Sequence, residues 1–173
     1  MDTSVLGKLA DNLEINEVLA RYARGIDRLD PVMIRACYHD GAVDHHGTFE
    51  GPADKFVEWV VTELGRYSMT MHALAQTLIE YDAVSSDVAF AETYALAFHR
   101  NPDGRQGDNW ITGFRYFDRF ERRPVDGGSA RWRIAERTVV GEWLSVDPMA
   151  SHRKFPAGMT VGQRDGTDLV QGR

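Results

Sequence analysis

The stretch Asp87-Val-Ala-Phe-Ala-Glu-Thr-Tyr-Ala-Leu-Ala-Phe-His-Arg100 decides the fold, because two kinds of side chain alternate along it without a break. Large or polar residues fill every second position over Val88–Phe98, and residues no bigger than threonine fill the positions between them over Ala89–Ala97. A period of two is typical of a β-strand with two different faces. The small face, which ends in His99, predicts either close packing against helices or a cavity.

More strands are predicted on both sides of this stretch. The loop 101–108 is dense in turn residues and predicts a hairpin into a strand over Asn109–Glu121. The turn 124–129 then leads to a last long strand over Arg131–Leu144. Shorter strands are expected at Thr77–Tyr81 and at Ala42–Gly47.

The first half of the chain has helical spacing instead. A helix over about residues 7–28 is predicted by an apolar stripe with 4-3-4-3 spacing, namely Ile15, Leu19, Tyr22, Ile26 and Leu29. Asp30-Pro31 predicts the N-cap and first position of a short helix that stops near Gly41. A third helix is expected from Gly51-Pro52 to Gly65. Three helices followed by long antiparallel strands indicate the α+β class.

Composition excludes several classes of protein. The 173 residues suit one domain, and 20 Lys+Arg against 26 Asp+Glu give a net charge of −6, which argues against a nucleic-acid partner. One cysteine excludes an intramolecular disulfide framework, and no stretch approaches the roughly 18 apolar residues of a membrane span. The first residues, Met1-Asp-Thr-Ser, lack the layout of a signal peptide, so we expect a soluble, cytoplasmic protein.

Histidines are the first candidates for chemistry. His39 follows the second predicted helix and is interpreted as structural. In Asp44-His45-His46, adjacent side chains on a strand point to opposite faces, so only one histidine is expected to line a cavity, and no metal site is predicted.

His72 and Asp27 form the second group of candidates. Each could be a satisfied structural residue, or the Asp27 carboxylate could orient the His72 imidazole as an acid–base group. Tyr22 lies five residues before Asp27, about 140° around the helix, and could flank the same pocket or be a core tyrosine. Arg137 is expected to share a strand face with Val139 and Trp143, either as an anion clamp or paired with a structural acid.

The order and spacing of these motifs resemble a known family. The run Ile15-x6-Tyr22-x4-Asp27-x2-Asp30, the pairs Met71-His72 and Phe98-His99, Gly113-x2-Tyr116-x-Asp118, and Trp132-x-Ile134-x2-Arg137-x5-Trp143 look like the SnoaL-like branch of the nuclear-transport-factor-2-like superfamily. The resemblance covers roughly residues 6–145. It implies a cone-shaped roll, in which a strongly curved antiparallel sheet wraps around the three N-terminal helices and encloses a deep pocket.

Within that branch the chain is similar to the dehydratase group, which includes scytalone dehydratase and bile-acid 7α-dehydratase. The resemblance implies a catalytic Asp27–His72 pair with Tyr22 and His99, and places His45 where a pocket tyrosine is used. It also implies no metal or organic cofactor and a homo-oligomer, commonly a trimer, with a dimer as the alternative. The positions of two of the group's substrate-reading residues are here Gly113 and Gly141, so no substrate is carried over.

The function expected is a cofactor-independent dehydratase acting on a small hydrophobic cyclic hydroxy or keto compound. An isomerase or polyketide cyclase on the same pocket, or a non-catalytic protein such as a ligand binder or a dioxygenase small subunit, are the alternatives. The expected substrate-binding residues are His45, Ala97, Arg137, Val139, Trp143 and Phe155. Residues 1–147 are expected to form the roll and residues 148–173 a tail that is either a lid anchored by Phe155 and Met159 or a disordered end.

Overall fold

The computed structural model describes residues 3–102, 108–125, 127–148 and 155–169. Its elements in chain order are α1 (Thr3–Arg28), α2 (Pro31–Ala36), β1 (Tyr38–His46), β2 (Phe49–Pro52), α3 (Ala53–Leu64), β3 (Met69–Tyr81), β4 (Val88–Arg100), β5 (Asn109–Pro124) and β6 (Ala130–Asp147). The helices precede the long strands, which confirms the α+β class.

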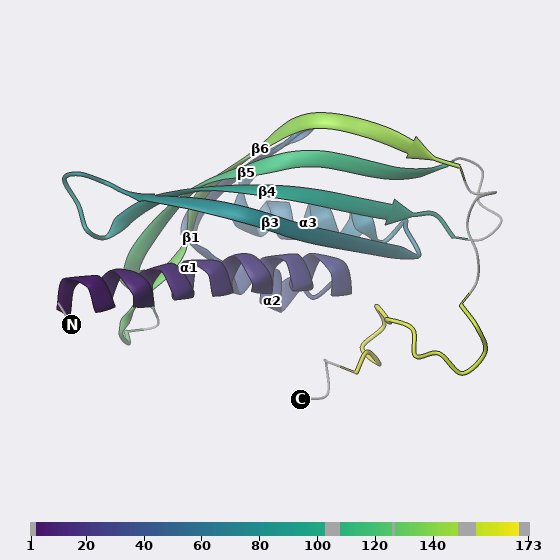
Figure 1. The fold of residues 1–173 in the computed structure, drawn as a ribbon, viewed down its shortest axis with the longest axis horizontal. Coiled ribbons are helices and arrows are strands. Elements are labelled where there is room, and N and C mark those ends of the chain that lie inside the picture. Colours follow the sequence, from purple (N-terminus) through teal and green to yellow (C-terminus); the bar gives the residue numbers. More distant parts are fainter. Residues whose placement is uncertain (1–2, 103–107, 126, 149–154, 170–173) are drawn as a thin grey trace.

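One six-stranded sheet runs in the order β2-β1-β6-β5-β4-β3 and leaves β2 and β3 as its two edges. Neighbouring strands are antiparallel except β1 and β6, which pair in parallel. Figure 1 shows the sheet curving over the helices, with α1 lying along the same side as α2 and α3. The sheet and the three helices therefore form the expected roll, with one parallel strand pair in place of an all-antiparallel sheet.

The alternation in β4 is the one expected from the sequence. Its small residues are at most 4% exposed: Ala89, Ala91, Thr93, Ala95 and Ala97. Tyr94 and Leu96, on the other face, are exposed. The small face serves two purposes, because Ala89 and Ala91 lie in the packed core whereas Ala97 lines a cavity. Both interpretations of that face hold, at different ends of one strand.

The apolar stripe of α1 is buried in the same core. Ile15, Leu19, Tyr22 and Ile26 are each at most 2% exposed, which supplies the tertiary packing that holds the helix. The helix ends at Arg28, and Leu29 adopts a positive φ of 52° that turns the chain into α2. The predicted Asp30 cap is confirmed, since its carboxylate accepts a hydrogen bond from the Met33 amide at 2.9 Å. This turn fixes the end of α1, where Asp27 lies.

Several predicted boundaries were wrong. The strand expected at Ala42–Gly47 already begins at Tyr38. The second helix ends at Ala36 rather than near Gly41, because Tyr38 already pairs with Ile134 of β6. Gly41, with a φ of +76°, lies where the β1–β6 register shifts, so its conformational freedom serves a bulge and not a helix end. The strand expected at Thr77 begins at Met69, so that His72 lies within β3.

Candidate active site

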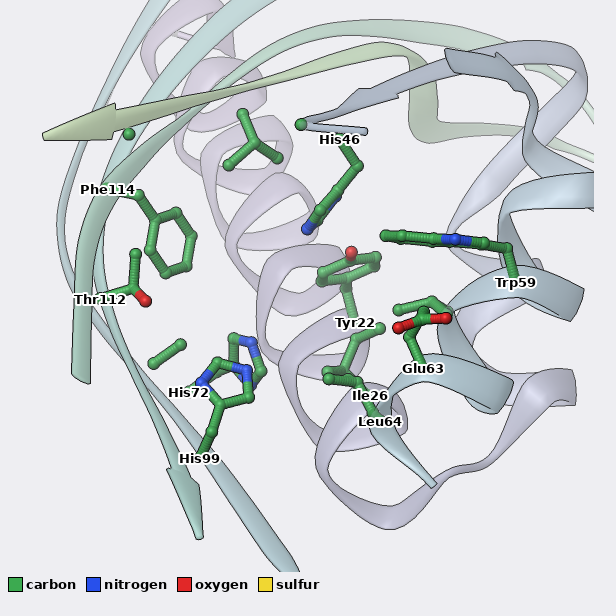
Figure 2. A pocket seen from close by; sticks show the side chains of 15 residues that line it. Tyr22, Ile26, His46, Trp59, Glu63, Leu64, His72, His99, Thr112 and Phe114 are labelled. Atoms are coloured by element: carbon green, nitrogen blue, oxygen red, sulfur yellow. The ribbon is translucent and has the colours of Figure 1, made fainter. Parts of the chain in front are cut away.

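A cavity of about 310 Å³ lies between the concave face of the sheet and helices α1 and α3. Its wall is mostly apolar, and the small residues Ala97 and Gly141 leave space between larger lining side chains such as Trp59 and Phe114. Figure 2 shows three histidines, His46, His72 and His99, among the residues around it. An apolar cavity of this size with a few polar groups is typical of a small-molecule site.

Asp27 and His72 meet at the wall of this cavity. The Nδ1 atom of His72 lies 2.7 Å from Asp27 Oδ1, and the backbone amide of His72 donates to Asp27 Oδ2 at 2.8 Å. The Thr70 hydroxyl donates to Asp27 Oδ1 at 3.0 Å. The last turn of α1 presents the carboxylate, while Thr70 and His72 lie two residues apart on one face of β3. The sequence could not show whether Asp27 and His72 touch, and the structure shows that they do.

The electrostatics of this pair favour an ionised carboxylate. Burial works to raise the pKa of Asp27, but the hydrogen bonds from His72 and Thr70 outweigh burial and hold the pKa below its ordinary value. A carboxylate can only accept hydrogen bonds, so it fixes the proton of a neutral His72 on Nδ1 and leaves the lone pair on Nε2. This is the arrangement of an oriented general base.

His99 lies beside His72 and is held neutral. The two rings are 6.0 Å apart between centroids, and the Tyr67 ring lies 5.0 Å from that of His99 on another side. Burial, and then the neighbouring His72, lower the pKa of His99 to about 4. Within the described chain, its Nδ1 has no hydrogen-bond partner. A neutral imidazole with a free nitrogen can accept or donate one hydrogen bond to a ligand.

Tyr22 lines the cavity above a buried ion pair. The guanidinium of Arg137 lies between the rings of Tyr22 and Tyr116, 4.0 and 3.8 Å from their centroids. Arg137 also donates to both carboxylate oxygens of Asp118, at 2.6 and 2.7 Å. The sequence allowed two roles for Arg137, an anion clamp or the partner of a structural acid. The structure pairs it with Asp118 beneath the cavity wall, and Arg137 is not among the lining residues. Burial raises the pKa of Tyr22 well above its usual range, so its hydroxyl stays protonated.

His46, not His45, is the histidine of β1 that lines the cavity. The bulge at Gly41 sets which residues of β1 face inward, and this register places His45 on the far side, beside Glu50 and Glu136 at 3.6 and 3.4 Å. The alternation of a strand predicted that one of the two would enter the pocket but could not select it.

Val139 lines the cavity as expected, but Trp143 does not. Phe114 pairs with Gly141 and Gly113 pairs with Trp143, so Glu142 is an extra residue in β6. Such a bulge reverses the alternation of the strand beyond it. Trp143 is therefore on the outer face, where its indole covers Gly113 so closely that a Cβ there would lie 2.3 Å from the ring.

The tail contacts the molecule through polar groups rather than its predicted apolar anchors. Phe155 and Met159 are exposed, and Phe155 is not among the residues that line the cavity. Arg164 instead donates to the backbone carbonyls of Asp27, Leu64 and Tyr67 at 2.8–3.1 Å. The tail thus crosses the ends of α1 and α3, next to the Asp27–His72 pair.

His39 is structural, for a different reason from the one expected. It lies in β1 rather than at a helix end, and its Nε2 is 2.7 Å from the backbone carbonyl of Glu121. Burial, and then the charge of Arg123, lower the pKa of His39 to about 4.

Several site residues were missed by sequence reasoning. Thr70 could have been found had the strand been extended back from Thr77, because Thr70 and His72 are two positions apart. Trp59 and Glu63 lie on the cavity side of α3, and Thr112 and Phe114 on that of β5. Among the described residues, no group of three or more His, Cys, Asp or Glu side chains is placed to hold a metal ion. In that same part of the chain no helix is long and apolar enough to cross a membrane.

A family model described as the SnoaL-like domain matches residues 7–138, which include Tyr22, Asp27, His72, His99 and Arg137. The chain belongs to the SnoaL-like domain family. A comparison with curated proteins found no match.

Solved structures share this fold at low sequence identity. A hexachlorocyclohexane dehydrochlorinase, LinA-type3 from Novosphingobium barchaimii LL02, is 18% identical with a TM-score of 0.70, covering 87% of this chain and 98% of its own. A candidate scytalone dehydratase from Novosphingobium aromaticivorans is 20% identical with a TM-score of 0.64, covering 84% and 97%. The Kfla4162 protein from Kribbella flavida is 20% identical with a TM-score of 0.68, covering 80% and 95%. At these identities the likeness establishes the fold.

Proposed function

We propose that this SnoaL-like protein is a cofactor-independent lyase, a dehydratase, for a small hydrophobic cyclic hydroxy or keto compound. The observation that carries the proposal is the contact of 2.7 Å between His72 Nδ1 and Asp27 Oδ1 at the wall of an apolar cavity. The dehydrochlorinase and the candidate scytalone dehydratase among the structural neighbours support a small-molecule role of the isomerase or dehydratase kind.

His72 is the proposed base. Its Nε2 would take an acidic proton from the carbon next to a carbonyl, and Asp27 would stabilise the imidazolium that forms. Acid–base catalysis of this kind contributes a factor of about 10²–10⁴ in rate, and positioning of the substrate in the cavity must supply the remainder. Asp27 and His72 are linked by two hydrogen bonds, so the base is already oriented before a ligand binds.

Other groups would act on the oxygen of the substrate. Tyr22 stays protonated and can donate its hydroxyl proton into a hydrogen bond. Arg137 is committed to Asp118 and would act only through the rings of Tyr22 and Tyr116 that it contacts. His99 can add one hydrogen bond next to His72.

An isomerase or cyclase would use the same base and differ in where the proton returns. A non-catalytic ligand binder or a dioxygenase-type small subunit would not need Asp27 and His72 to meet. We place both alternatives below the lyase. A non-catalytic binder would permit His72 and Asp27 to lie more than about 4 Å apart, whereas His72 Nδ1 and Asp27 Oδ1 are 2.7 Å apart.

The base can be tested without knowing the substrate. In D₂O, the protein is expected to accelerate exchange of the C2 protons of 1-tetralone, a cyclic ketone, as followed by NMR. His72→Gln should lose this activity, and His45→Gln, on the other side of β1, should keep it. No exchange above background with 1-tetralone and related cyclic ketones would count against a base in this pocket.

Dehydration itself needs a leaving group. The probe 3-hydroxy-1-tetralone loses water to give 1-naphthol, whose fluorescence reports each turnover. Naphthol formation would favour the dehydratase, while exchange without naphthol would favour an isomerase or cyclase.

We also propose that the protein assembles as a homo-oligomer, a trimer or a dimer. The outer face of the sheet exposes Met71, Tyr94, Leu96, Phe117 and Trp143. Exposed apolar surface of this kind is typical of a contact between proteins. Analytical ultracentrifugation should give a mass above one chain, and Phe117→Glu should lower it.

The lid remains a prediction. Truncation after Asp147 is expected to weaken binding of 1-tetralone while leaving the fold intact, as measured by circular dichroism. An unchanged affinity would instead mark residues 148–173 as a terminal extension with no role at the pocket.

A further inference from the structure

A second histidine–carboxylate pair lies at the end of the cavity away from His72. His46 Nδ1 is 3.3 Å from Asp44 Oδ1, and the Tyr38 hydroxyl donates to Asp44 Oδ2 at 2.5 Å. Asp44 is fully buried, and across the described residues no donor meets its Oδ1 in good hydrogen-bond geometry. The nitrogen that lies toward this unpaired carboxylate oxygen is His46 Nδ1, and an N–H group at that position would be its donor.

Two aromatic side chains of α3 hold the ring of His46. Phe56 stacks on it with 5.1 Å between centroids, and Trp59 lies at 6.0 Å. Figure 2 shows the ring reaching into the cavity toward the Tyr22 hydroxyl, with His72 and His99 together at the other end. Because Nδ1 is turned toward Asp44, Nε2 is the nitrogen that a ligand would meet.

The wall at this end of the cavity holds a donor without an acceptor. The Tyr22 hydroxyl is buried, and it meets no hydrogen-bond partner in good geometry among the residues that the structure describes. The Arg137 guanidinium, 4.0 Å from the centroid of the Tyr22 ring, adds positive charge behind it. Donors in a water-poor site stabilise an oxygen that gains negative charge.

We propose that His46 Nε2 and the Tyr22 hydroxyl receive the carbonyl oxygen of the substrate, opposite the base. This assignment rests on the proposed function and narrows its substrate class. The substrate would be a cyclic ketone whose oxygen lies at the His46 end while the acidic C–H bond lies at the His72 end.

The proton balance of such a reaction closes within the chain. His72 takes the C–H proton, and the electron pair of that bond forms the enol double bond. His46 reacts in this scheme as the imidazolium, which keeps its Nδ1 proton toward Asp44 and gives its Nε2 proton to the carbonyl oxygen. The enol then collapses, its proton returns to His46, and the hydroxyl group on the next carbon leaves. That hydroxyl takes the proton from His72, so the products are an enone and water.

Ligand binding tests the assignment without turnover. The probes are 2-naphthol, which presents one acidic oxygen, and naphthalene, which has the same rings and none. We expect the wild-type protein to bind 2-naphthol at least tenfold more tightly, and part of the bound probe to absorb as the naphtholate.

Two substitutions of His46 separate binding from structure. The Asn amide occupies the place of Nδ1 and can still donate to Asp44, whereas the Gln amide occupies the place of Nε2 and can still donate to a ligand. We expect His46→Asn to lose most of the preference for 2-naphthol and His46→Gln to keep part of it. His45→Asn is the matched control and should bind both probes like the wild-type protein.

The result that overturns the assignment is equal binding of the two probes, or a preference that survives both His46→Asn and Tyr22→Phe. If the Asn variant does not fold, the Gln and Tyr22→Phe variants carry the same comparison. If the protein exchanges the C2 protons of 1-tetralone but binds 2-naphthol and naphthalene equally, the His46 role is refuted and the proposed lyase is not. If the protein prefers 2-naphthol through His46 but catalyses neither proton exchange nor water loss, the lyase is refuted and the oxygen-binding role of His46 is not.

Discussion

Replacing Asp27 by Asn is expected to separate the chemistry of the pocket from its stability. Asp27 accepts hydrogen bonds from the His72 ring, the His72 backbone amide and the Thr70 hydroxyl. The Asn side chain has one oxygen, which best satisfies the buried backbone amide. Its NH₂ group then faces His72 Nδ1, which becomes an acceptor, so the proton moves to Nε2 and the lone pair needed by the base is lost.

The size of the effect follows from these contacts. Loss of an oriented general base should slow exchange of the 1-tetralone C2 protons by about 10²–10⁴, or about 3–5 kcal/mol in activation free energy. The three hydrogen bonds to an ionised carboxylate are replaced by weaker bonds to a neutral amide, which should cost about 1–3 kcal/mol in the free energy of unfolding. For a domain of this size that corresponds to a decrease in Tm of about 2–4 °C per kcal/mol.

The assay is NMR exchange together with a thermal melt of the same sample. Thr70→Val removes only the hydroxyl group and should slow exchange by less than about tenfold, since both His72 bonds remain. Asp30→Asn is the matched control, because asparagine caps α2 as well as aspartate does and the residue lies outside the cavity. An Asp27→Asn rate close to that of the wild-type protein would refute the oriented-base argument.

Three further outcomes follow from buried groups. The pKa of His39 is lowered to about 4, so below pH 6.5 the unfolded chain binds a proton that the folded chain does not. Stability that is present above pH 6.5 is therefore lost as pH falls toward 4, and urea titrations of His39→Gln should show a weaker pH dependence. Arg137→Met leaves Asp118 buried without its partner and should cost about 3–5 kcal/mol in urea, whereas adding Asp118→Leu should recover part of it. Arg164→Ala removes three hydrogen bonds to backbone carbonyls and should make the tail a faster target for limited proteolysis; an unchanged cleavage rate would contradict this docking.

Much of the fold could be predicted because its signals are local. The alternation over Asp87–Arg100, the stripe from Ile15 to Ile26 and the Asp30 cap each depend on neighbours within a turn or a strand. The boundaries that were wrong at the second helix and at β3 depend on partners far along the chain. Tyr38 pairs with Ile134, and Met69 pairs with Arg100, and neither pairing leaves a mark on the local sequence.

The site was predicted in type more than in detail. An aspartate and a histidine 45 residues apart were singled out, but only the position of β3 against the end of α1 brings them to 2.7 Å. Two bulges determine which other predicted side chains line the cavity. The shift at Gly41 brings His46 into the cavity in place of His45, and the extra Glu142 turns Trp143 to the outside.

The sequence by itself determined the α+β class, the small inner face of β4 and the kinds of groups available for acid–base chemistry, because periodicity and capping are short-range properties of a chain. The tertiary structure alone decided which histidine enters the pocket, which acid Arg137 pairs with, and that Tyr22 and His46 share the end opposite His72. The physical reason is register. A bulge of one residue reverses the two faces of a strand, and its position depends on pairing between segments distant in sequence.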